Sequence, residues 1–152
     1  MSRKDKEIKD KDEIESTIKR ANVCRIGLAE NNIPYVVPLV FGYKDNCLYF
    51  HSAPEGKKID IIKRNNNVCF EIDTDCELVK SETACNWDIK YYSVIGFGKA
   101  FFIDDPEEKR TALNIIMKHY SGNSYEYPAN EINEVAIIKV KINSMTRKKS
   151  GY

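Results

Sequence analysis

The sequence lacks the features of several common protein classes. No apolar run approaches the roughly 18 residues that a membrane-spanning helix needs, so we expect no membrane span. The first residues carry charges of both signs with no apolar segment behind them, so we expect no signal peptide. There are two histidines, and the five cysteines show no C-x-x-C spacing. This scarcity argues against a zinc finger or ribbon, and we expect no metal site.

An excess of one charge is also missing. Lys and Arg number 24 against 23 Asp and Glu, which gives a net charge of +1 at pH 7. The basic clusters are short, for example Lys57-Lys58 and Arg147-Lys148-Lys149. A nucleic-acid-binding surface needs concentrated basic charge, so we expect no nucleic-acid partner. An odd number of cysteines without a secretory signal favours reduced thiols and a cytoplasmic protein.

What the sequence does contain suits one globular domain. Hydrophobic residues make up 42% of 152 residues, enough for a proper core, and we expect a single domain over residues 1–152. Residues 1–11 are almost wholly charged, and we expect them to be flexible. Asp12, followed by Glu15, predicts a helix over residues 12–21.

Apolar and alternating runs predict strands at residues 23–29, 33–43, 47–50, 68–73, 91–103 and 134–142. Pro34 and Pro38 fall inside the second of these, which is therefore expected to be an edge strand or bulged. The alternative is that these prolines only protect an edge. Gly96 and Gly98 predict a sharp bend or a close backbone approach in the fifth strand.

Two further helices are predicted, one at residues 57–65 and one that begins at Asp105-Pro106 and ends at Ser121-Gly122-Asn123. Residues 74–90 show no regular pattern, and residues 145–152 are expected to be a polar, basic tail. Six strands joined mainly by short turns, with about three helices, predict an α+β fold that is mainly β. We expect an antiparallel barrel with peripheral helices rather than a doubly wound parallel sheet.

Residues 49–64 carry the clearest candidate site. A strand ends at His51 and Ser52, a Gly-containing turn follows, and a helix begins near Lys57 and Lys58. Free backbone N–H groups at such a helix start, surrounded by basic side chains, suit an anion and in particular a phosphate.

Local signals refine this prediction and leave an alternative open. Ser52 with Glu55 has the form of a capping box, and Pro54 suits the first helical turn. The alternative is that the two lysines only face solvent and that His51 is a hydrogen-bonded histidine at a strand end.

Several segments beyond residue 20 form a specific pattern by their order and spacing. They are the proline-punctuated residues 33–43, then 48–53 with 56–58 and Asp60, then 68–71 and 91–100, with weaker similarity at 107–109, 119–120 and 145–149. In these segments the chain resembles the pyridoxamine 5′-phosphate oxidase-like, FMN-binding split-barrel flavoproteins. Within them it resembles the nitroimidazole-reductase branch.

The resemblance implies a six-stranded antiparallel split β-barrel that forms a homodimer, with two FMN sites at the subunit interface. It implies that the FMN phosphate is held by His51, Ser52, Lys57 and Lys58. Backbone groups along the flavin ring would come from Val36, Val37, Pro38 and Leu39. Segments that approach the flavin, often from the partner subunit, contain Trp87, Tyr92 and Ser93, and a tail that can fold back contains Arg147 and Lys148.

The resemblance also implies an oxidoreductase that passes electrons from NAD(P)H or another donor to a small acceptor. In the nitroimidazole-reductase branch, that acceptor would be an aromatic nitro compound. The flavin would carry the chemistry, and no side chain is predicted as an obligatory acid or base. Two alternatives share the fold: a flavin-binding sensor or carrier without turnover, and a split barrel that binds FAD, haem or a deazaflavin. A third is a small barrel that binds a macromolecule and no flavin.

Overall fold

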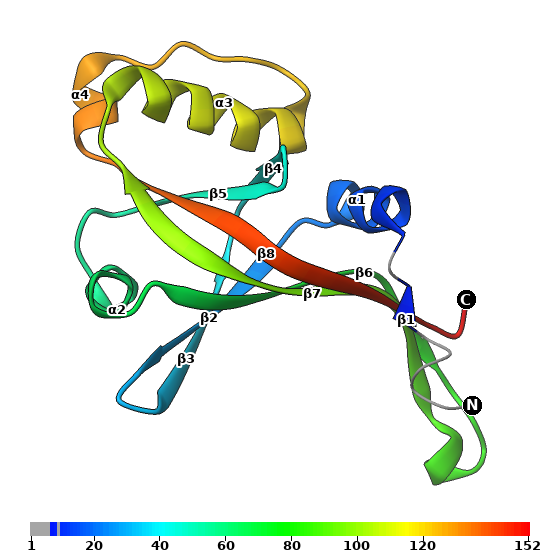
Figure 1. Cartoon of the computed structure of the whole chain (residues 1–152). Coiled ribbons are helices and arrows are strands. Elements are labelled where there is room, and N and C mark those ends of the chain that lie inside the picture. Colours follow the sequence, from blue (N-terminus) through cyan, green and yellow to red (C-terminus); the bar gives the residue numbers. More distant parts are fainter. Residues whose placement is uncertain (1–6, 9) are drawn as a thin grey trace.

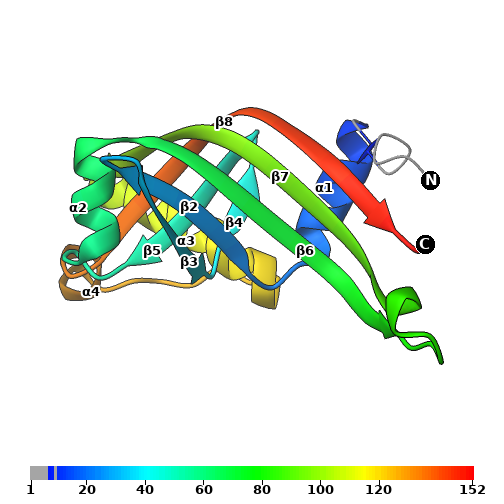
Figure 2. The same cartoon turned by 90° about the horizontal axis from the view of Figure 1, so that it is seen from below.

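The computed structural model describes residues 7–8 and 10–152. Within this part of the chain, eight strands form one antiparallel sheet in the order β3-β2-β6-β7-β8-β5-β4, with β1 paired to β8. The long strands curve along their length, so the sheet bends round into a partial barrel (Figure 1, Figure 2). The strands are β1 (Glu7–Ile8), β2 (Cys24–Glu30), β3 (Ile33–Leu39), β4 (Gly42–Lys44), β5 (Cys47–Ser52), β6 (Asn67–Val79), β7 (Asp88–Ile103) and β8 (Ala136–Ser150).

Helices cover the sheet from outside. They are α1 (Lys11–Arg20), α2 (Lys57–Arg64), α3 (Pro106–Ser121) and α4 (Ala129–Asn133), with a short 3₁₀ turn at Ala84–Asn86. Helix α1 packs against β6, β7 and β8, α2 lies beside β2, and α3 covers β4 and β5. Helices α3 and α4 lie together at one end of the molecule (Figure 1). In the described residues, no helix is both long and apolar enough to cross a membrane.

The predicted class, a mainly antiparallel β fold with peripheral helices, is confirmed. The best-predicted element is α3, whose N-cap Asp105 accepts a hydrogen bond from the Glu108 N–H at 3.0 Å. Pro106 occupies the first turn, and Gly122 ends the helix with a φ of 76°. Each of these signals acts on neighbouring residues, so sequence alone locates them.

Several predicted boundaries are wrong. The strand expected at 33–43 is two strands, β3 and β4, and with β1 this raises the number of strands from six to eight. The segment expected to be irregular is mostly strand, because β6 and β7 extend as a hairpin around the 3₁₀ turn. The expected polar tail is the second half of β8, whose main chain pairs with β7 up to Ser150. Main-chain pairing with a distant strand therefore overrides the polar composition of these segments.

The N-terminal helix also begins earlier than predicted. Its N-cap is Asp10, whose carboxylate accepts a hydrogen bond from the Glu13 N–H at 3.1 Å, and not Asp12. Of the stretch 1–11 expected to be flexible, residues 1–6 and 9 lie outside the described residues. Glu7–Ile8 form β1 against β8. Helix α4 was not predicted.

Two glycines set the curvature of β7. An added Cβ at Gly96 would overlap the ring of Phe70, and one at Gly98 would overlap the carbonyl oxygen of Lys141. A β-bulge falls between Phe97 and Gly98 where β7 pairs with β8. The predicted close backbone approach is therefore confirmed, and it lets the fully buried ring of Phe70 pack directly on β7.

Candidate functional site

The link between β5 and α2 has an open helix start. Helix α2 begins at Lys57 after Gly56, whose φ is 138°, and no side chain caps its free backbone N–H groups. The expected capping box is wrong, because the Ser52 hydroxyl donates to the neighbouring Ala53 carbonyl at 2.7 Å. Pro54 also lies before the helix and not in its first turn. The N–H groups at this helix start are therefore left for a ligand.

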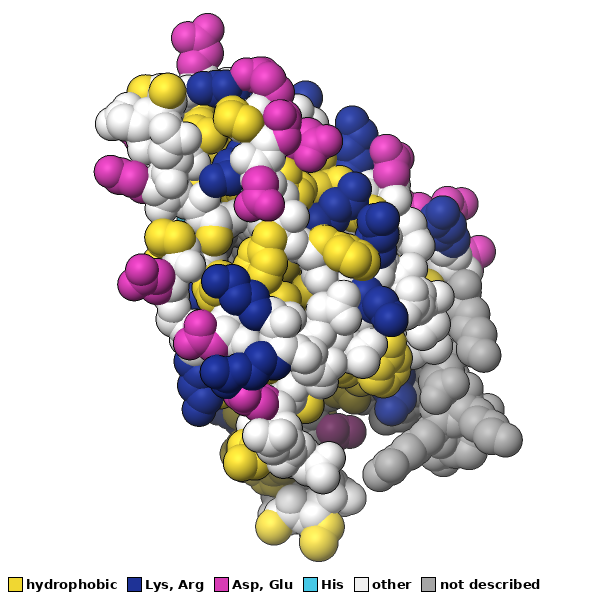
Figure 3. Space-filling model, turned by 60° about the vertical axis from the view of Figure 1, so that its left-hand side comes forward, with side chains coloured by type: hydrophobic (Ala, Val, Ile, Leu, Met, Phe, Trp, Pro, Cys, Tyr) yellow, Lys and Arg dark blue, Asp and Glu magenta, His cyan; other side chains and the backbone are white. Residues whose placement is uncertain are grey.

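Two lysines, Lys57 and Lys58, stand at this helix start. Neither Lys57 nor Lys58 forms an ion pair with any residue that the structure describes. The Lys57 amine lies 4.8 Å from the centroid of the Tyr35 ring, which brings α2 next to β3. A cavity of about 300 Å³ lies here, lined by residues of the β2–β3 hairpin together with Lys57 and Ile61. On the side of the molecule that includes α2, basic side chains lie among hydrophobic ones (Figure 3).

His51 lies at the end of β5, where it pairs with Ile137 of β8. Burial lowers the pKa of the imidazole below its usual range, so the ring is neutral at neutral pH. A neutral imidazole offers one N–H donor and one acceptor. Free N–H groups, two unpaired ammonium groups and a neutral imidazole together form a donor set that fits a phosphate monoester such as that of FMN.

Strand β3 forms an outer edge of the sheet and, within the part of the chain that the structure describes, pairs with β2 alone. Val37 and Leu39 pack in part against the core, whereas Val36 is 63% exposed on the opposite face. Proline lacks an N–H, so Pro34 and Pro38 are best placed at positions that point away from β2. The main-chain groups of alternate residues in a strand point to the same side. We therefore expect the main-chain groups of Val36, which lies between the two prolines, to face the open edge.

The remaining predicted residues lie at the other end of the sheet. Ser93 pairs with Lys148 across β7 and β8, and Trp87, which is 47% exposed, precedes β7 in the long β6–β7 hairpin. In Figure 1 this hairpin and the end of β8 lie opposite the end that carries α2 and β3. The predicted residues thus come from both ends of β7, and Ser93 lies three strands across the sheet from β3.

Arg147 and Tyr92 contact each other on the face covered by α1. Arg147 is 7% exposed, and its Nε donates to the Thr17 hydroxyl at 2.7 Å. Its Nη1 lies 3.2 Å from the Glu13 carboxylate. Its guanidinium carbon lies 4.6 Å from the centroid of the Tyr92 ring. Both side chains therefore have partners inside the protomer.

Sequence reasoning missed a charged cluster on the opposite face of the sheet. Arg25 Nη1 lies 2.8 Å from Asp73 and 3.3 Å from Glu71, and the Cys76 thiol donates to Asp73 at 3.4 Å. Burial, reinforced by the neighbouring Asp73, raises the pKa of Glu71 to about 7. Glu71, Asp73, Cys76 and Ser93 are among the residues that line a cavity of about 390 Å³. The signal in the sequence was the pair of acidic residues at alternate positions of one strand. Their contact with Arg25 could not be predicted, because it depends on which residues of β2 and β6 stand opposite each other.

Sequence reasoning also missed an apolar strip across this face. Val36, Gly27, Cys69 and Phe97 stand in one register row across β3, β2, β6 and β7. Phe97 is 55% exposed, and its strand neighbour Ile95 is 40% exposed. An added Cβ at Gly27 would meet only ordinary van der Waals contacts. Exposed apolar surface spread over several adjacent strands is typical of an interaction surface.

Comparisons with known proteins agree with this architecture. The family model described as pyridoxamine 5′-phosphate oxidase matches residues 10–149. Among solved structures, a candidate 5-nitroimidazole antibiotic resistance protein from Bacteroides thetaiotaomicron is 42% identical. It has a TM-score of 0.84 over 94% of this chain and 86% of that chain. A search of curated proteins found no match.

Two more distant structures share the fold. A flavocytochrome from Azotobacter vinelandii is 19% identical, with a TM-score of 0.81 over 96% of this chain and 70% of that chain. An FAD- and haem-binding protein from Mycobacterium smegmatis is 14% identical, with a TM-score of 0.84 over 97% of this chain and 74% of that chain. At these identities the likeness shows the fold alone. The predicted split barrel is confirmed, and the match over residues 10–149 shows that the chain belongs to the pyridoxamine 5′-phosphate oxidase family.

Proposed function

We propose that this protein binds FMN with the phosphate at the start of α2. The observation that carries the proposal is the uncapped helix start with two unpaired lysines, Lys57 and Lys58, next to the half-buried His51. Ser52 lies at the same strand end, and its oxygen can still accept a hydrogen bond although its proton is used by Ala53. A phosphate there would complete hydrogen bonds that the protomer leaves unmade.

The flavin ring is proposed to lie along the open edge of β3. Main-chain groups from the stretch Val36, Val37, Pro38 and Leu39 would bind its polar edge. The contact between Lys57 and Tyr35 supports this arrangement, because it brings the proposed phosphate site next to that strand. A protein with the same fold binds FAD and haem, so the experiment below tests whether FMN is the flavin bound here.

We further propose that the protein acts as a homodimer with the flavins at the interface. Two observations support this: Trp87 lies in the β6–β7 hairpin, at the other end of β7 from the strand end that carries His51, and the apolar strip around Phe97 is exposed. A second copy would bring Trp87, Ser93 and Lys148 to the flavin. We leave Tyr92 and Arg147 out of the proposed contacts, because both are already engaged against α1.

Five free thiols support a reducing, cytoplasmic location.

The proposed activity is the transfer of electrons from NAD(P)H or another donor to a small acceptor. Bound FMN would supply the redox chemistry, while the protein holds it and shields it from water. The relative from Bacteroides thetaiotaomicron, which is described as a candidate 5-nitroimidazole antibiotic resistance protein, makes an aromatic nitro compound the first acceptor to test.

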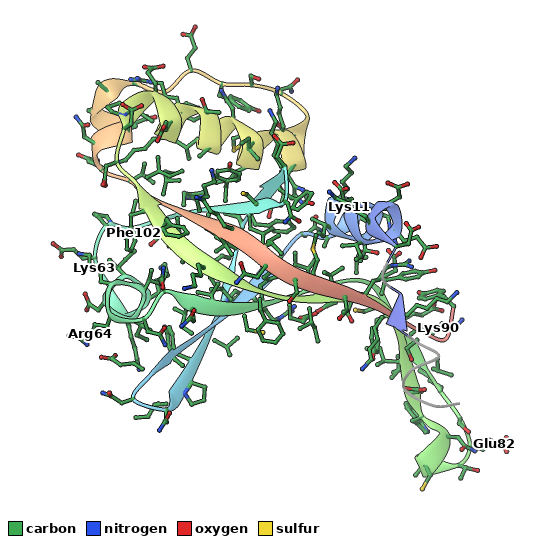
Figure 4. The ribbon with its side chains drawn as sticks, in the orientation of Figure 1. Lys11, Lys63, Arg64, Glu82, Lys90 and Phe102 are labelled. Carbon is green, nitrogen blue, oxygen red and sulfur yellow. The ribbon has the colours of Figure 1, made fainter. Side chains whose placement is uncertain are left out.

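The visible absorption spectrum tests the flavin site first. Purified protein is mixed with FMN, freed of unbound ligand and measured, and the double variant Lys57→Ala/Lys58→Ala is treated in the same way. The control is Lys63→Ala, at the far end of the same helix, where Lys63 points away from the sheet (Figure 4). We expect a retained flavin spectrum in the unmodified protein and the control, and at least about tenfold weaker retention in the double variant.

Failure of the unmodified protein to retain FMN would overturn the proposal, and FAD, haem and a deazaflavin would then be tested in the same way. Equal retention of FMN by the double variant would show that the phosphate does not bind at the start of α2. A turnover assay with NADH or NADPH and a nitroimidazole then separates an oxidoreductase from a flavin carrier without turnover.

A further inference from the structure

A second cavity lies away from the proposed flavin site. It has a volume of about 580 Å³ and is lined by residues of α1, β4 and α3 together with Ser124. Figure 1 shows α1 and α3 on either side of β4, at a distance from α2. None of the lining residues belongs to the predicted flavin contacts. A ligand bound here would therefore be separate from the FMN phosphate.

The cavity wall is rich in positive charge. Lys19 of α1, Lys44 of β4 and Lys118 of α3 all line it. None of the three forms an ion pair with a residue that the structure describes. Three separate elements thus bring like charges to one cavity, and an anion bound there would reduce their mutual repulsion.

Neutral groups of the wall also lack the partners that an anion would supply. The Tyr43 hydroxyl oxygen is buried, and no described residue makes a well-formed hydrogen bond with it, although the Glu15 carboxylate and the Asn46 main chain lie near it. Asn114 accepts from the Tyr125 N–H at 2.9 Å and from the Tyr127 hydroxyl at 3.1 Å. Its carbonyl oxygen is thus occupied, and its NH₂ group is the end available to a ligand. A buried hydroxyl without a partner is unfavourable, so a ligand acceptor would stabilise the site.

Two lining residues besides the lysines, Tyr43 and His119, are titratable. Burial raises the pKa of Tyr43, and the negative charge of Glu15 raises it further, so the phenol is protonated and can donate. The His119 ring nitrogen Nε2 lies 2.6 Å from the Ala21 carbonyl oxygen, which requires the proton to be on Nε2. Three lysines therefore line the cavity, and one carboxylate, that of Glu15, lies beside Tyr43.

We propose that the cavity between α1, β4 and α3 binds a small anionic molecule with at least two negative charges, carried by phosphate or carboxylate groups. Lys19, Lys44 and Lys118 would neutralise its charge, and Tyr43 and Asn114 would donate hydrogen bonds to it. The cavity volume lies within the range of small-molecule sites, so the cavity has room for a metabolite that carries such groups.

Calorimetric titration and backbone-amide NMR test this site with three probes: pyrophosphate, citrate and uncharged glucose. The protein is first saturated with FMN, so that any flavin phosphate site is filled. The Lys57→Gln/Lys58→Gln variant is titrated in parallel, so that a failure of the flavin proposal does not affect the result. We expect pyrophosphate or citrate to bind and to shift amides of α1, β4 and α3, and glucose to do neither. The stronger of the two anions identifies the phosphate or the carboxylate class.

Matched variants locate the binding. The triple variant Lys19→Gln/Lys44→Gln/Lys118→Gln is expected to bind the anion at least about tenfold more weakly. Tyr43→Phe removes only the hydroxyl and is expected to weaken binding about threefold to tenfold. The control triple variant carries Gln at the exposed positions Lys11, Lys63 and Lys80, and its affinity should not change. Undisturbed amides in α1, β4 and α3, or equal affinity of the first triple variant and the control, would overturn the proposal.

Discussion

The Arg147 guanidinium lies over the ring of Tyr92, 4.6 Å from its centroid, and this contact joins the end of β8 to β7 and α1. The C-terminal Tyr152 stacks on the same Tyr92 ring, with centroids 4.8 Å apart and planes 7° from parallel. Arg20 of α1 lies 5.2 Å from that ring. One tyrosine therefore holds together the first helix, the last strand and the last residue of the chain.

This relationship predicts that Arg147→Ala destabilises the fold. The change removes the bond to Thr17, the ion pair with Glu13 and the contact with Tyr92, and it leaves a cavity under α1. We expect the free energy of unfolding to fall by about 2–3 kcal/mol, measured by urea denaturation. Lys149→Ala, at an exposed position of the same strand, should change it by less than about 0.5 kcal/mol. Similar losses in both variants would contradict the role assigned to Arg147.

The acid pair predicts a dependence of stability on pH. Glu71 faces Arg25, Asp73 and the nearby Cys76, and its pKa rises from 4.5 to about 7, mainly because of burial. Between these two pH values the folded state binds more protons than the unfolded state, so this group makes stability fall as pH rises through that interval. Asp73, whose pKa is lowered, acts oppositely and loses its contribution as pH falls below its ordinary range.

Glu71→Gln isolates the first effect. Urea unfolding at pH 5 and at pH 7.5 should show that the variant gains stability relative to the unmodified protein as pH rises. Glu77→Gln, at an exposed position of the same strand, should show a constant difference. A constant difference for Glu71→Gln as well would show that its carboxyl is ionised at both pH values.

Phe97→Glu tests the proposed dimer. A charge in the apolar strip would have to be buried in the dimer without a partner, so we expect the variant to be monomeric by light scattering coupled to gel filtration. If the flavin is bound at the interface, retention of FMN should fall together with the dimer. Tyr125→Glu is the control, because Tyr125 is a 45% exposed aromatic in the loop after α3. A dimeric Phe97→Glu variant would place the interface elsewhere.

Elements with local signals were the predictable part of the fold. Helix α3 carries its start and stop signals within its own sequence, at Asp105 and Gly122. The end of β8 carries none, because Lys148 and Lys149 have the composition of a solvated tail. They form a strand because β7 offers them a main-chain partner more than fifty residues away in the chain. No local pattern records such a partner.

In the candidate site, too, the residues that are close in sequence were predicted and those that meet through strand pairing were not. His51, Ser52, Lys57 and Lys58 were predicted to lie together because one continuous turn connects them. The cluster of Arg25, Glu71 and Asp73 was missed, because it depends on which residues of β2 and β6 stand opposite each other. The capping box was misassigned because Ser52 bonds to the nearest carbonyl and the helix starts only after Gly56.

The two outer strands of the sheet limit how the molecule can assemble. Strand β3 carries Pro34 and Pro38, which lack donors, and β4 is only three residues long. Neither edge offers a full row of main-chain donors and acceptors to a strand from another molecule. The protein is thereby protected against uncontrolled strand-by-strand growth into fibrils, and specific association has to use side chains on the sheet faces.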